Sequence, residues 1–449
     1  TPEDIGANTV DYSVSTKASV NALGVYAEQG TDSTQTLSYT FAKVAGQWRI
    51  SDLPDGIVLS RTSFDNFFNP YPIYFFDPDY HYLVPDVRWF PTGSTVQDRI
   101  VSALINGPSD WLQQGVVASA FPVGVQRGSP VAVKNSTATV DFSANVASTK
   151  EPALGRMLRQ LDASLLTSTI TSVVMTARGA PLPVSDSQES QARPAAAIDP
   201  APLIQKGKQF GFYPGLSPIG TISARIAALN GSAATLDRAQ TAAAVLAPSG
   251  VWLVTGTATK LVDSRPSLIA PSIDTAGYVW SVPSTDASAI RAVGSDGVVH
   301  SITSTLPPGA TIVSLDVSHD GTRLLVYLST SSGPRLIVAG VVRRAGVPTA
   351  LSTPLLDLPV SSAVPIDATW VDPMTVAALG SNGGDDTVIS YVIGGSPGDA
   401  STTEGGVRLV GGTNSDTLRL LTESGQVEQL RATGWQNINV VASILATQQ

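Results

Sequence analysis

The sequence predicts a multidomain, mainly β protein, in which a partial α+β N-terminal domain and a second α+β domain precede a C-terminal β-propeller. Three observations lead to this prediction. At about 150 residues per domain, a chain of 449 residues favours about three domains. Charged residues make up only 14% of the chain, whereas 39 glycines and 31 prolines suit a protein with many turns. Strand–turn–strand units also recur in the C-terminal half.

Composition along the chain suggests where the domains begin and end. The text between residues 181 and 207 loses all periodicity and is rich in Pro, Ala and Ser, which is typical of a connector between folded units. We therefore expect a partial N-terminal domain at 1–68, a second α+β domain at 69–185, a linker at 186–208 and the propeller at 209–449.

The N-terminal segment carries the pattern of a β-hairpin. Apolar and polar residues alternate over 37–41, a turn follows at 45–46, and Trp48 and Ile50 mark the return strand. This alternation is typical of a strand pair with one buried face. Because the segment is short for an independent domain, we expect it to be truncated here.

The second domain mixes strand and helix signals. The pattern predicts strands at 73–76, 82–90, 138–142 and 171–177. A helix is expected to start at a capping box over 94–97 and to end at 107–108, a Gly-Pro pair. A second helix is indicated by a 3.6-residue apolar stripe, formed by Leu154, Met157, Leu158, Leu161 and Leu165.

The C-terminal region repeats one unit of strand, turn and strand. Its turns at Gly321, Pro373 and Gly425 are spaced by 52 and 52 residues. Propeller blades repeat at about 40 to 50 residues, so the region suggests about five or six blades. We expect no long helix after residue 209, and we expect the strand at 438–445 to pair with the first blade and close the ring.

Composition also excludes several function classes. A net charge of −9 disfavours nucleic acid as a partner, because phosphate needs a basic face. The absence of cysteine excludes thiol nucleophiles, disulfides and cysteine-ligated metals. No phosphate-binding glycine motif is present. We therefore expect no enzyme activity, no cofactor and no bound metal; a hydrolase site around His300 or His319 is the least favoured alternative.

Three clusters of carboxylates are candidate metal or acid/base sites, but the same residues are also common in tight turns. The clusters are Asp77 with Asp79 and His81, Asp316 with His319 and Asp320, and Asp385 with Asp386. Such groups could bind a metal ion or exchange protons. Asp, Pro and Gly at these positions are also what tight turns require, and we favour that interpretation.

Residues 87–185 differ from the rest in charge, with eight bases against five acids. Arginine suits carboxylate and phosphate recognition, and aromatic rings suit sugar stacking or protein contacts. The candidate ligand or partner surface is Arg88, Trp89, Trp111, Arg127, Arg156 and Arg159. The alternative is that the charges are dispersed over a solvated surface and that the aromatic residues belong to the core.

Particular motifs resemble a known family. Residues 83–91 (LVPDVRWFP) and 103–124 are similar to a GerMN domain. Residues 47–60 and the FFNPYPIYFFDP text after them resemble the N-terminal region of the actinobacterial LpqB lipoprotein family, whose members carry a propeller after the GerMN domain. Further likenesses are Trp48, Arg49 and Ile50 to the last strand of nuclear-transport-factor-like folds, and 318–321 to the Ser-Pro-Asp-Gly turns of TolB-like propellers, with His319 replacing proline.

The resemblance implies a non-enzymatic extracytoplasmic lipoprotein, which binds and modulates a two-component sensor histidine kinase in cell-envelope homeostasis and division. It also implies lipid anchoring to the outer face of the cell membrane, through a cysteine that would precede this chain. The alternative is a cell-wall module that binds peptidoglycan or an anionic wall polymer through the GerMN domain.

Overall fold

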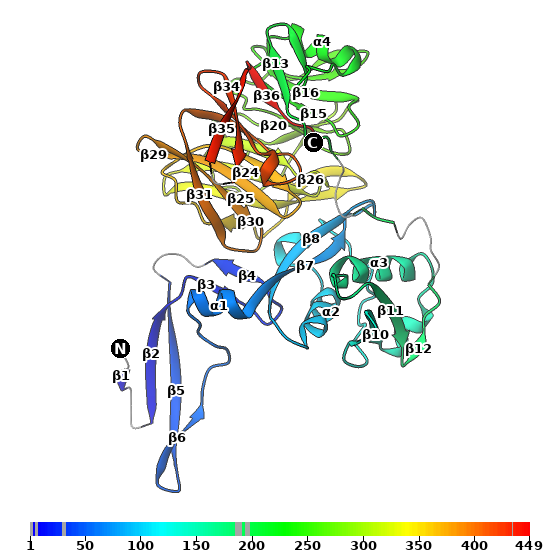
Figure 1. Cartoon of the computed structure of the whole chain (residues 1–449), viewed down its shortest axis with the longest axis vertical. Coiled ribbons are helices and arrows are strands. Elements are labelled where there is room, and N and C mark those ends of the chain that lie inside the picture. The colour runs from blue at the N-terminus through cyan, green and yellow to red at the C-terminus, as the bar shows by residue number, and fades with distance from the viewer. Residues whose placement is uncertain (1–2, 5–7, 29–32, 185–190, 194–197, 433) are drawn as a thin grey trace.

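The computed structural model describes residues 3–4, 8–28, 33–184, 191–193, 198–432 and 434–449. It has three regions arranged along one long axis: a narrow N-terminal arm, an α+β domain and a large β domain (Figure 1). Strands dominate, so the predicted mainly β class is confirmed. None of the helices in these residues combines the length and hydrophobicity needed to cross a lipid bilayer.

The N-terminal arm is a sheet of order β1-β2-β5-β6. Its strands are β1 (Glu3–Asp4), β2 (Thr9–Ser15), β5 (Thr34–Val44) and β6 (Gln47–Asp52), and a second pair is β3 (Ala18–Val20) with β4 (Tyr26–Glu28). The predicted hairpin is confirmed, since β5 pairs antiparallel with β6. The predicted buried face is confirmed at Leu37, which is 9% exposed, but not at Trp48 and Ile50, which are 53% and 52% exposed because the sheet extends away from the other regions (Figure 1).

Helix α1 (Arg61–Phe67) connects the arm to the α+β domain. The Ser60 side chain caps it by accepting a hydrogen bond from the backbone N–H of Ser63. The ring of Phe64, within this helix, has its centroid 5.0 Å from that of the Phe68 ring and 5.1 Å from that of the Trp89 ring. This aromatic contact holds the base of the arm against the domain.

The α+β domain consists of a long hairpin, a four-stranded sheet and two helices. Its elements are β7 (Phe68–Phe76), β8 (Leu83–Pro91), α2 (Val96–Asn106), η1 (Asp110–Leu112), β9 (Ala132–Lys134), β10 (Thr137–Phe142), η2 (Ala144–Ser148), α3 (Ala153–Leu165), β11 (Ser172–Ala177) and β12 (Ala180–Pro181). The sheet order is β12-β11-β10-β9, and α3 connects the parallel strands β10 and β11. The predicted helices and strands are confirmed.

The predicted capping box at the start of α2 is wrong. Thr95 is the N-cap, but its backbone (φ −102°, ψ 5°) is not extended and its side chain makes no capping hydrogen bond. A capping side chain needs extended backbone to reach the N–H groups of the first turn. Gly107 ends the helix as expected, at φ +94°, a conformation that glycine adopts without strain.

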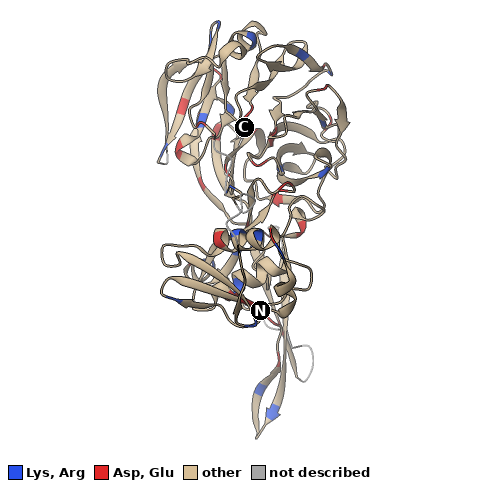
Figure 2. Cartoon of the chain, turned by 90° about the vertical axis from the view of Figure 1, so that its right-hand side faces the viewer, with Lys and Arg blue, Asp and Glu red and all other residues tan. Residues whose placement is uncertain are grey.

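The described C-terminal residues form six sheets around a common axis (Figure 2). The first sheet contains β13 (Leu203–Lys206), β14 (Gln209–Phe212) and β36 (Ile444–Ala446), and the second contains β15 (Ala233–Leu236), β16 (Ala242–Ala247), β17 (Gly250–Thr255) and β18 (Thr259–Asp263). The third contains β19 (Ser272–Ile273), β20 (Val279–Ser281), β21 (Arg291–Val293) and β22 (Val299–Ser301), and the fourth contains β23 (Thr311–Val317), β24 (Arg323–Thr330), β25 (Gly333–Arg344), β26 (Val347–Leu351) and β27 (Leu356–Leu358). The fifth contains β28 (Val364–Asp372), β29 (Thr375–Asn382), β30 (Asp385–Val392) and β31 (Pro397–Thr403), and the sixth contains β32 (Gly406–Val410), β33 (Arg419–Thr422), β34 (Gln426–Arg431) and β35 (Gly434–Val441).

The ring is closed by the C-terminal strand. Ile444 and Leu445 of β36 pair with Gln205 and Ile204 of β13, so the predicted pairing of the last strand with the first blade is confirmed. The C-terminal strand thus completes the first blade and fastens the two ends of the ring together. Strand β13 lies within the range expected as a linker, and residues 185–190 and 194–197 of the connector lie outside the described residues.

The propeller contains a short helix that the sequence pattern did not indicate. No long helix was predicted after residue 209, and α4 (Gly220–Ala228) lies there. Its Ile222 and Ile226 are buried in a core shared with the first and second sheets. A helix of nine residues is too short to display a long periodic stripe, which is why its pattern was missed.

A continuous apolar core joins the α+β domain to the propeller. Gly340 of β25 lies so close to the domain that an added Cβ would be 2.5 Å from Val116 Cγ2 and 2.9 Å from the carbonyl oxygen of Trp111. Gln114 Nε2 donates a hydrogen bond of 2.8 Å to the carbonyl oxygen of Thr353. The two regions are therefore packed together rather than joined by the connector alone.

Candidate functional site

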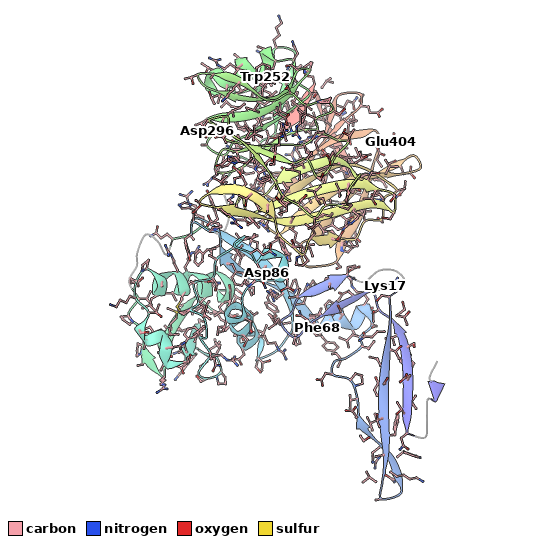
Figure 3. The ribbon with its side chains drawn as sticks, turned by 180° about the vertical axis from the view of Figure 1, so that it is seen from behind. Lys17, Phe68, Asp86, Trp252, Asp296 and Glu404 are labelled. Atoms are coloured by element: carbon pink, nitrogen blue, oxygen red, sulfur yellow. The ribbon has the colours of Figure 1, made fainter. Side chains whose placement is uncertain are left out.

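Arg88, predicted on a recognition surface, lies inside the α+β domain. Its side chain is 1% exposed, and Nη2 donates to Asp86 Oδ2 at 2.7 Å. Asp86, labelled in Figure 3, also accepts hydrogen bonds of 2.8 Å from the backbone N–H and the hydroxyl of Ser109. The surface placement of Arg88 is wrong, because both faces of β8 are covered and Arg88 completes a buried ion pair.

The two tryptophans of the predicted surface lie at contacts between regions. Trp89 packs against Tyr26 and Phe64, and its Nε1 donates a hydrogen bond of 2.7 Å to the carbonyl oxygen of Gly394 in the propeller. Trp111 is 7% exposed and lies against Gly340. Trp111 is thus buried and Trp89 is half-buried, and both are used in contacts between regions.

The remaining predicted arginines are engaged within the protein. Arg127 forms an ion pair with Asp98. The Arg156 guanidinium stacks over the Tyr80 ring at 3.7 Å, and Arg159 Nε donates a hydrogen bond of 2.9 Å to the carbonyl oxygen of Ala192. Basic and acidic positions are dispersed along the chain (Figure 2). A role for these arginines in ligand binding stays a prediction.

The cluster of Asp77, Asp79 and His81 lies in the turn between β7 and β8. Its potential ligand atoms lie within 4.8 Å of one another, close enough to bind one metal ion together. Asp77 Oδ1 also accepts a hydrogen bond of 2.6 Å from the backbone N–H of Tyr82. Burial raises the pKa of the Asp77 carboxyl to about 7. The predicted turn-forming role is confirmed by this hydrogen bond.

The second cluster, around His319 and Asp320, is a buried turn in the fourth blade. The Ser318 hydroxyl and the backbone N–H of Thr322 both donate to Asp320 Oδ1, and Gly321 has φ +74°. Arg323, which is fully buried, forms an ion pair with Asp320. The predicted structural role is therefore confirmed, and the hydrogen-bonding capacity of Asp320 is used within the turn.

Burial of His319 gives a testable pH dependence. Desolvation lowers its pKa from 6.5 to about 4, so the folded protein keeps it neutral while the unfolded chain binds a proton below pH 6.5. Stability is thus lost as the pH falls from 6.5 toward 4. Between pH 7.5 and 5, the unfolding free energy should fall by about 2 kcal/mol more in the wild type than in a His319→Gln variant.

Urea unfolding of both proteins at the two pH values measures this difference. Asp316, whose pKa burial raises to about 6, contributes the opposite slope to both proteins and cancels in the comparison. If the unfolding free energy changes equally with pH in the two proteins, the prediction that His319 is buried in its neutral form is contradicted.

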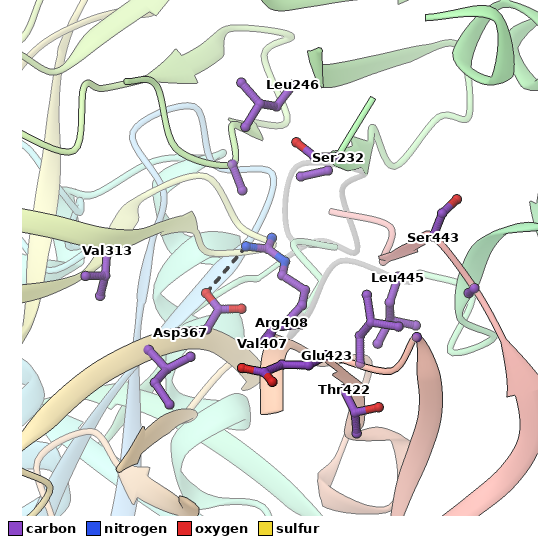
Figure 4. Close-up of a pocket in the computed structure, with 16 residues that line it drawn as sticks. Ser232, Leu246, Val313, Asp367, Val407, Arg408, Thr422, Glu423, Ser443 and Leu445 are labelled. Atoms are coloured by element: carbon purple, nitrogen blue, oxygen red, sulfur yellow. Dashed lines mark hydrogen bonds and ion pairs between the residues drawn. The ribbon is translucent and has the colours of Figure 1, made fainter. Parts of the chain in front are cut away.

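The propeller axis contains a cavity that the sequence did not reveal. Its volume is about 600 Å³, and its lining comes from strands of five of the six sheets and from loops, including Ala270 beside the third sheet. Arg408 of β32 and Asp367 of β28 meet there, joined by a contact of 3.4 Å between Nη1 and Oδ1 (Figure 4). The local sequence signal for this cavity was Arg408, a charged residue within the otherwise apolar sequence of residues 406–410.

Comparison with protein-family models matches all three regions. Residues 215–444 match the model described as "Lipoprotein LpqB beta-propeller domain". Residues 72–183 match "Sporulation and spore germination", and residues 1–65 match "Lipoprotein LpqB, N-terminal domain". The order of the three matches is the order of the arm, the α+β domain and the propeller.

Curated relatives carry the same description. Lipoprotein LpqB of Thermobifida fusca is 39% identical over 111 residues, which cover 23% of this chain and 16% of the relative. Lipoprotein LpqB of Bifidobacterium longum is 27% identical over 155 residues, covering 34% of this chain and 26% of the relative. The matched segments thus span well under two thirds of either relative.

Solved structures with partial likeness include two bacterial proteins. TolB from Acinetobacter baumannii aligns with a TM-score of 0.42 and 13% identity, covering 56% of this chain and 66% of that chain. The tandem GerMN domains of GerM from Bacillus subtilis align with a TM-score of 0.22 and 17% identity, covering 32% of this chain and 58% of that chain.

Proposed function

The chain belongs to the LpqB lipoprotein family, and from this premise we propose that it acts outside the cell membrane as a non-enzymatic recognition protein. Its partner in this proposal is the extracytoplasmic domain of a two-component sensor histidine kinase, which it modulates in cell-envelope homeostasis and division. A lipid anchor N-terminal to this chain would hold it at the outer face of the membrane.

The observation that carries the proposal is the packing of the GerMN-like α+β domain against the propeller. Their shared apolar core and the hydrogen bond from Trp89 to Gly394 fix the loops of both parts in one geometry. A partner surface held rigid before binding loses little conformational entropy when the complex forms. Loops on rigid scaffolds are also where binding residues concentrate. Such a body suits protein recognition.

A non-catalytic role is supported by how the polar clusters are used. His319 is 7% and Asp320 6% exposed, and the latter is bound within its own turn and to Arg323. A general acid or base must reach its substrate within hydrogen-bond distance. These groups instead stabilise the blade hairpin.

Cell-wall binding is the alternative function, and the observation that supports it is a set of exposed basic side chains on the α+β domain. The predicted arginines are engaged within the protein, so the accessible positive charge there includes Lys134, Lys150 and Arg178, all exposed. Attraction of an anionic polymer to such charges weakens as salt screens it. This alternative therefore predicts binding that is lost at high salt and on charge reversal.

Calorimetric titration distinguishes the two functions. The chain is titrated with the extracytoplasmic kinase domain of the same organism and, in parallel, with peptidoglycan fragments and anionic wall polymer. We expect saturable binding to the kinase domain that a Lys134→Glu/Lys150→Glu variant retains. Silence with the kinase, together with salt-sensitive binding to wall material that this variant loses, would replace the kinase function by the wall function.

A further inference from the structure

The cavity on the propeller axis has the size of a small-molecule site. Its volume of about 600 Å³ lies within the range of about 300–1,000 Å³ that is typical of ligand pockets. Apolar side chains form much of its wall, including Leu246, Val313, Ile366 and Leu445. The strands that provide these residues are held rigidly in the closed ring. A preformed cavity that combines apolar wall with a few polar and charged groups is what a small ligand requires.

Arg408 brings hydrogen-bonding capacity into this cavity that the protein does not use. Its side chain is 24% exposed, and its contact with Asp367 is long, at 3.4 Å. Its Nε is buried and has no hydrogen-bond partner in the described part of the chain. Asp367 is further held by the backbone N–H of Leu409, which donates to Oδ2 at 2.8 Å. Nη2 forms no hydrogen bond or ion pair with a described residue and is not enclosed by protein, so it is the donor that Arg408 retains for a ligand acceptor.

Glu423 supplies the opposite charge on the same cavity. It is exposed, it lies in the turn between β33 and β34, and it lines the cavity with Arg408 (Figure 4). Among the described residues its carboxylate forms neither an ion pair nor a hydrogen bond, so it does not reach Arg408. Two opposite charges thus face one cavity without neutralising each other.

The charge balance selects the ligand class. Asp367 already offsets much of the charge on Arg408, and Glu423 adds a second negative charge, so a simple anion would meet two carboxylates. A simple cation would leave the open Arg408 donor unused. A ligand with a carboxylate and an ammonium group satisfies both, since arginine binds carboxylates with paired hydrogen bonds.

We propose that this cavity binds a small zwitterion of the amino-acid class, a free amino acid or short peptide, with its carboxylate on Arg408 and its ammonium on Glu423. The apolar wall takes the side chain. The proposal concerns the face of the propeller that carries the cavity and is independent of kinase binding.

Calorimetry on the full chain tests the ligand class directly. The probes are glycine, L-leucine and the dipeptide L-alanyl-L-leucine, compared with N-acetylated and C-amidated forms of the dipeptide and with inorganic phosphate. We expect saturable binding of at least one zwitterion and at least tenfold weaker binding of both blocked forms. Silence with all zwitterions overturns the proposal, as does phosphate or the acetylated dipeptide binding equally well.

Substitutions assign the two charges. Glu423→Gln should weaken the dipeptide at least tenfold while leaving binding of its N-acetylated form unchanged, and Arg408→Gln should abolish both. Arg431→Gln, an exposed change in the same blade, is the matched control and should have no effect. Arg408→Gln leaves the buried Asp367 carboxylate without its ion-pair partner and could lower the stability of the fold. Glu423 is exposed, so the Glu423→Gln variant should keep the fold and still test the proposal. Unchanged dipeptide affinity in Glu423→Gln would refute the assignment.

Discussion

A Gly340→Val variant is expected to separate the α+β domain from the propeller and to lower the stability of the chain. The Cβ of any residue at this position would lie 2.5 Å from Val116 Cγ2 and 2.9 Å from the Trp111 carbonyl oxygen, and backbone cannot yield as a flexible side chain does. Overpacking of this kind costs about 1–3 kcal/mol where the structure absorbs it. Small-angle X-ray scattering should show a larger radius of gyration, and urea unfolding an earlier first transition.

Gly434→Val is the matched control. Gly434 begins the exposed strand β35, and a Cβ added there would have no heavy atom of another segment within 4 Å. Valine also suits a strand better than glycine does. If both variants keep the wild-type radius and stability, the tight packing at Gly340 is contradicted. If Gly340→Val also binds the kinase domain as tightly as the wild type, rigid docking is not what the partner recognises.

An Arg323→Ala variant is expected to lose about 3–5 kcal/mol of unfolding free energy, the usual cost of leaving a buried charge without its partner. Arg323 is fully buried, pairs with Asp320 and donates a hydrogen bond of 2.7 Å to the carbonyl oxygen of Pro373 in the next blade. Its guanidinium also lies 4.7 Å from the centre of the Trp370 ring. One side chain therefore links two adjacent sheets.

The comparison for Arg323→Ala is an exposed ion pair in the same blade. Arg335 and Asp357 are paired at 2.7 Å, with side chains 33% and 50% exposed. Exposed pairs contribute about 0–1 kcal/mol, so Arg335→Ala should barely move the urea midpoint. Equal losses in the two variants would show that the Arg323 network is not a buried anchor between blades.

Local patterns correctly predicted several features that depend on neighbouring residues. The apolar stripe from Leu154 to Leu165 correctly predicted helix α3, and the sequence of residues 318–321 correctly predicted a hairpin turn. Both predictions succeeded because periodicity and turn chemistry depend on residues close together in the chain. The spacing of the turns similarly indicated a propeller. The capping box failed, since it depends on the backbone angles of one residue, Thr95, which the text does not specify.

The sequence by itself determined the domain order, the mainly β class and most strands and helices, because these depend on short-range patterns. Only the tertiary structure decided that Arg88 is a buried ion-pair partner, that Trp89 and Trp111 join two regions, and that Arg408 meets Asp367 in a cavity. Asp367 and Arg408 lie on different sheets, 41 residues apart. Exposure, pairing and cavities arise where separate surfaces meet, and no local pattern records which surfaces those are.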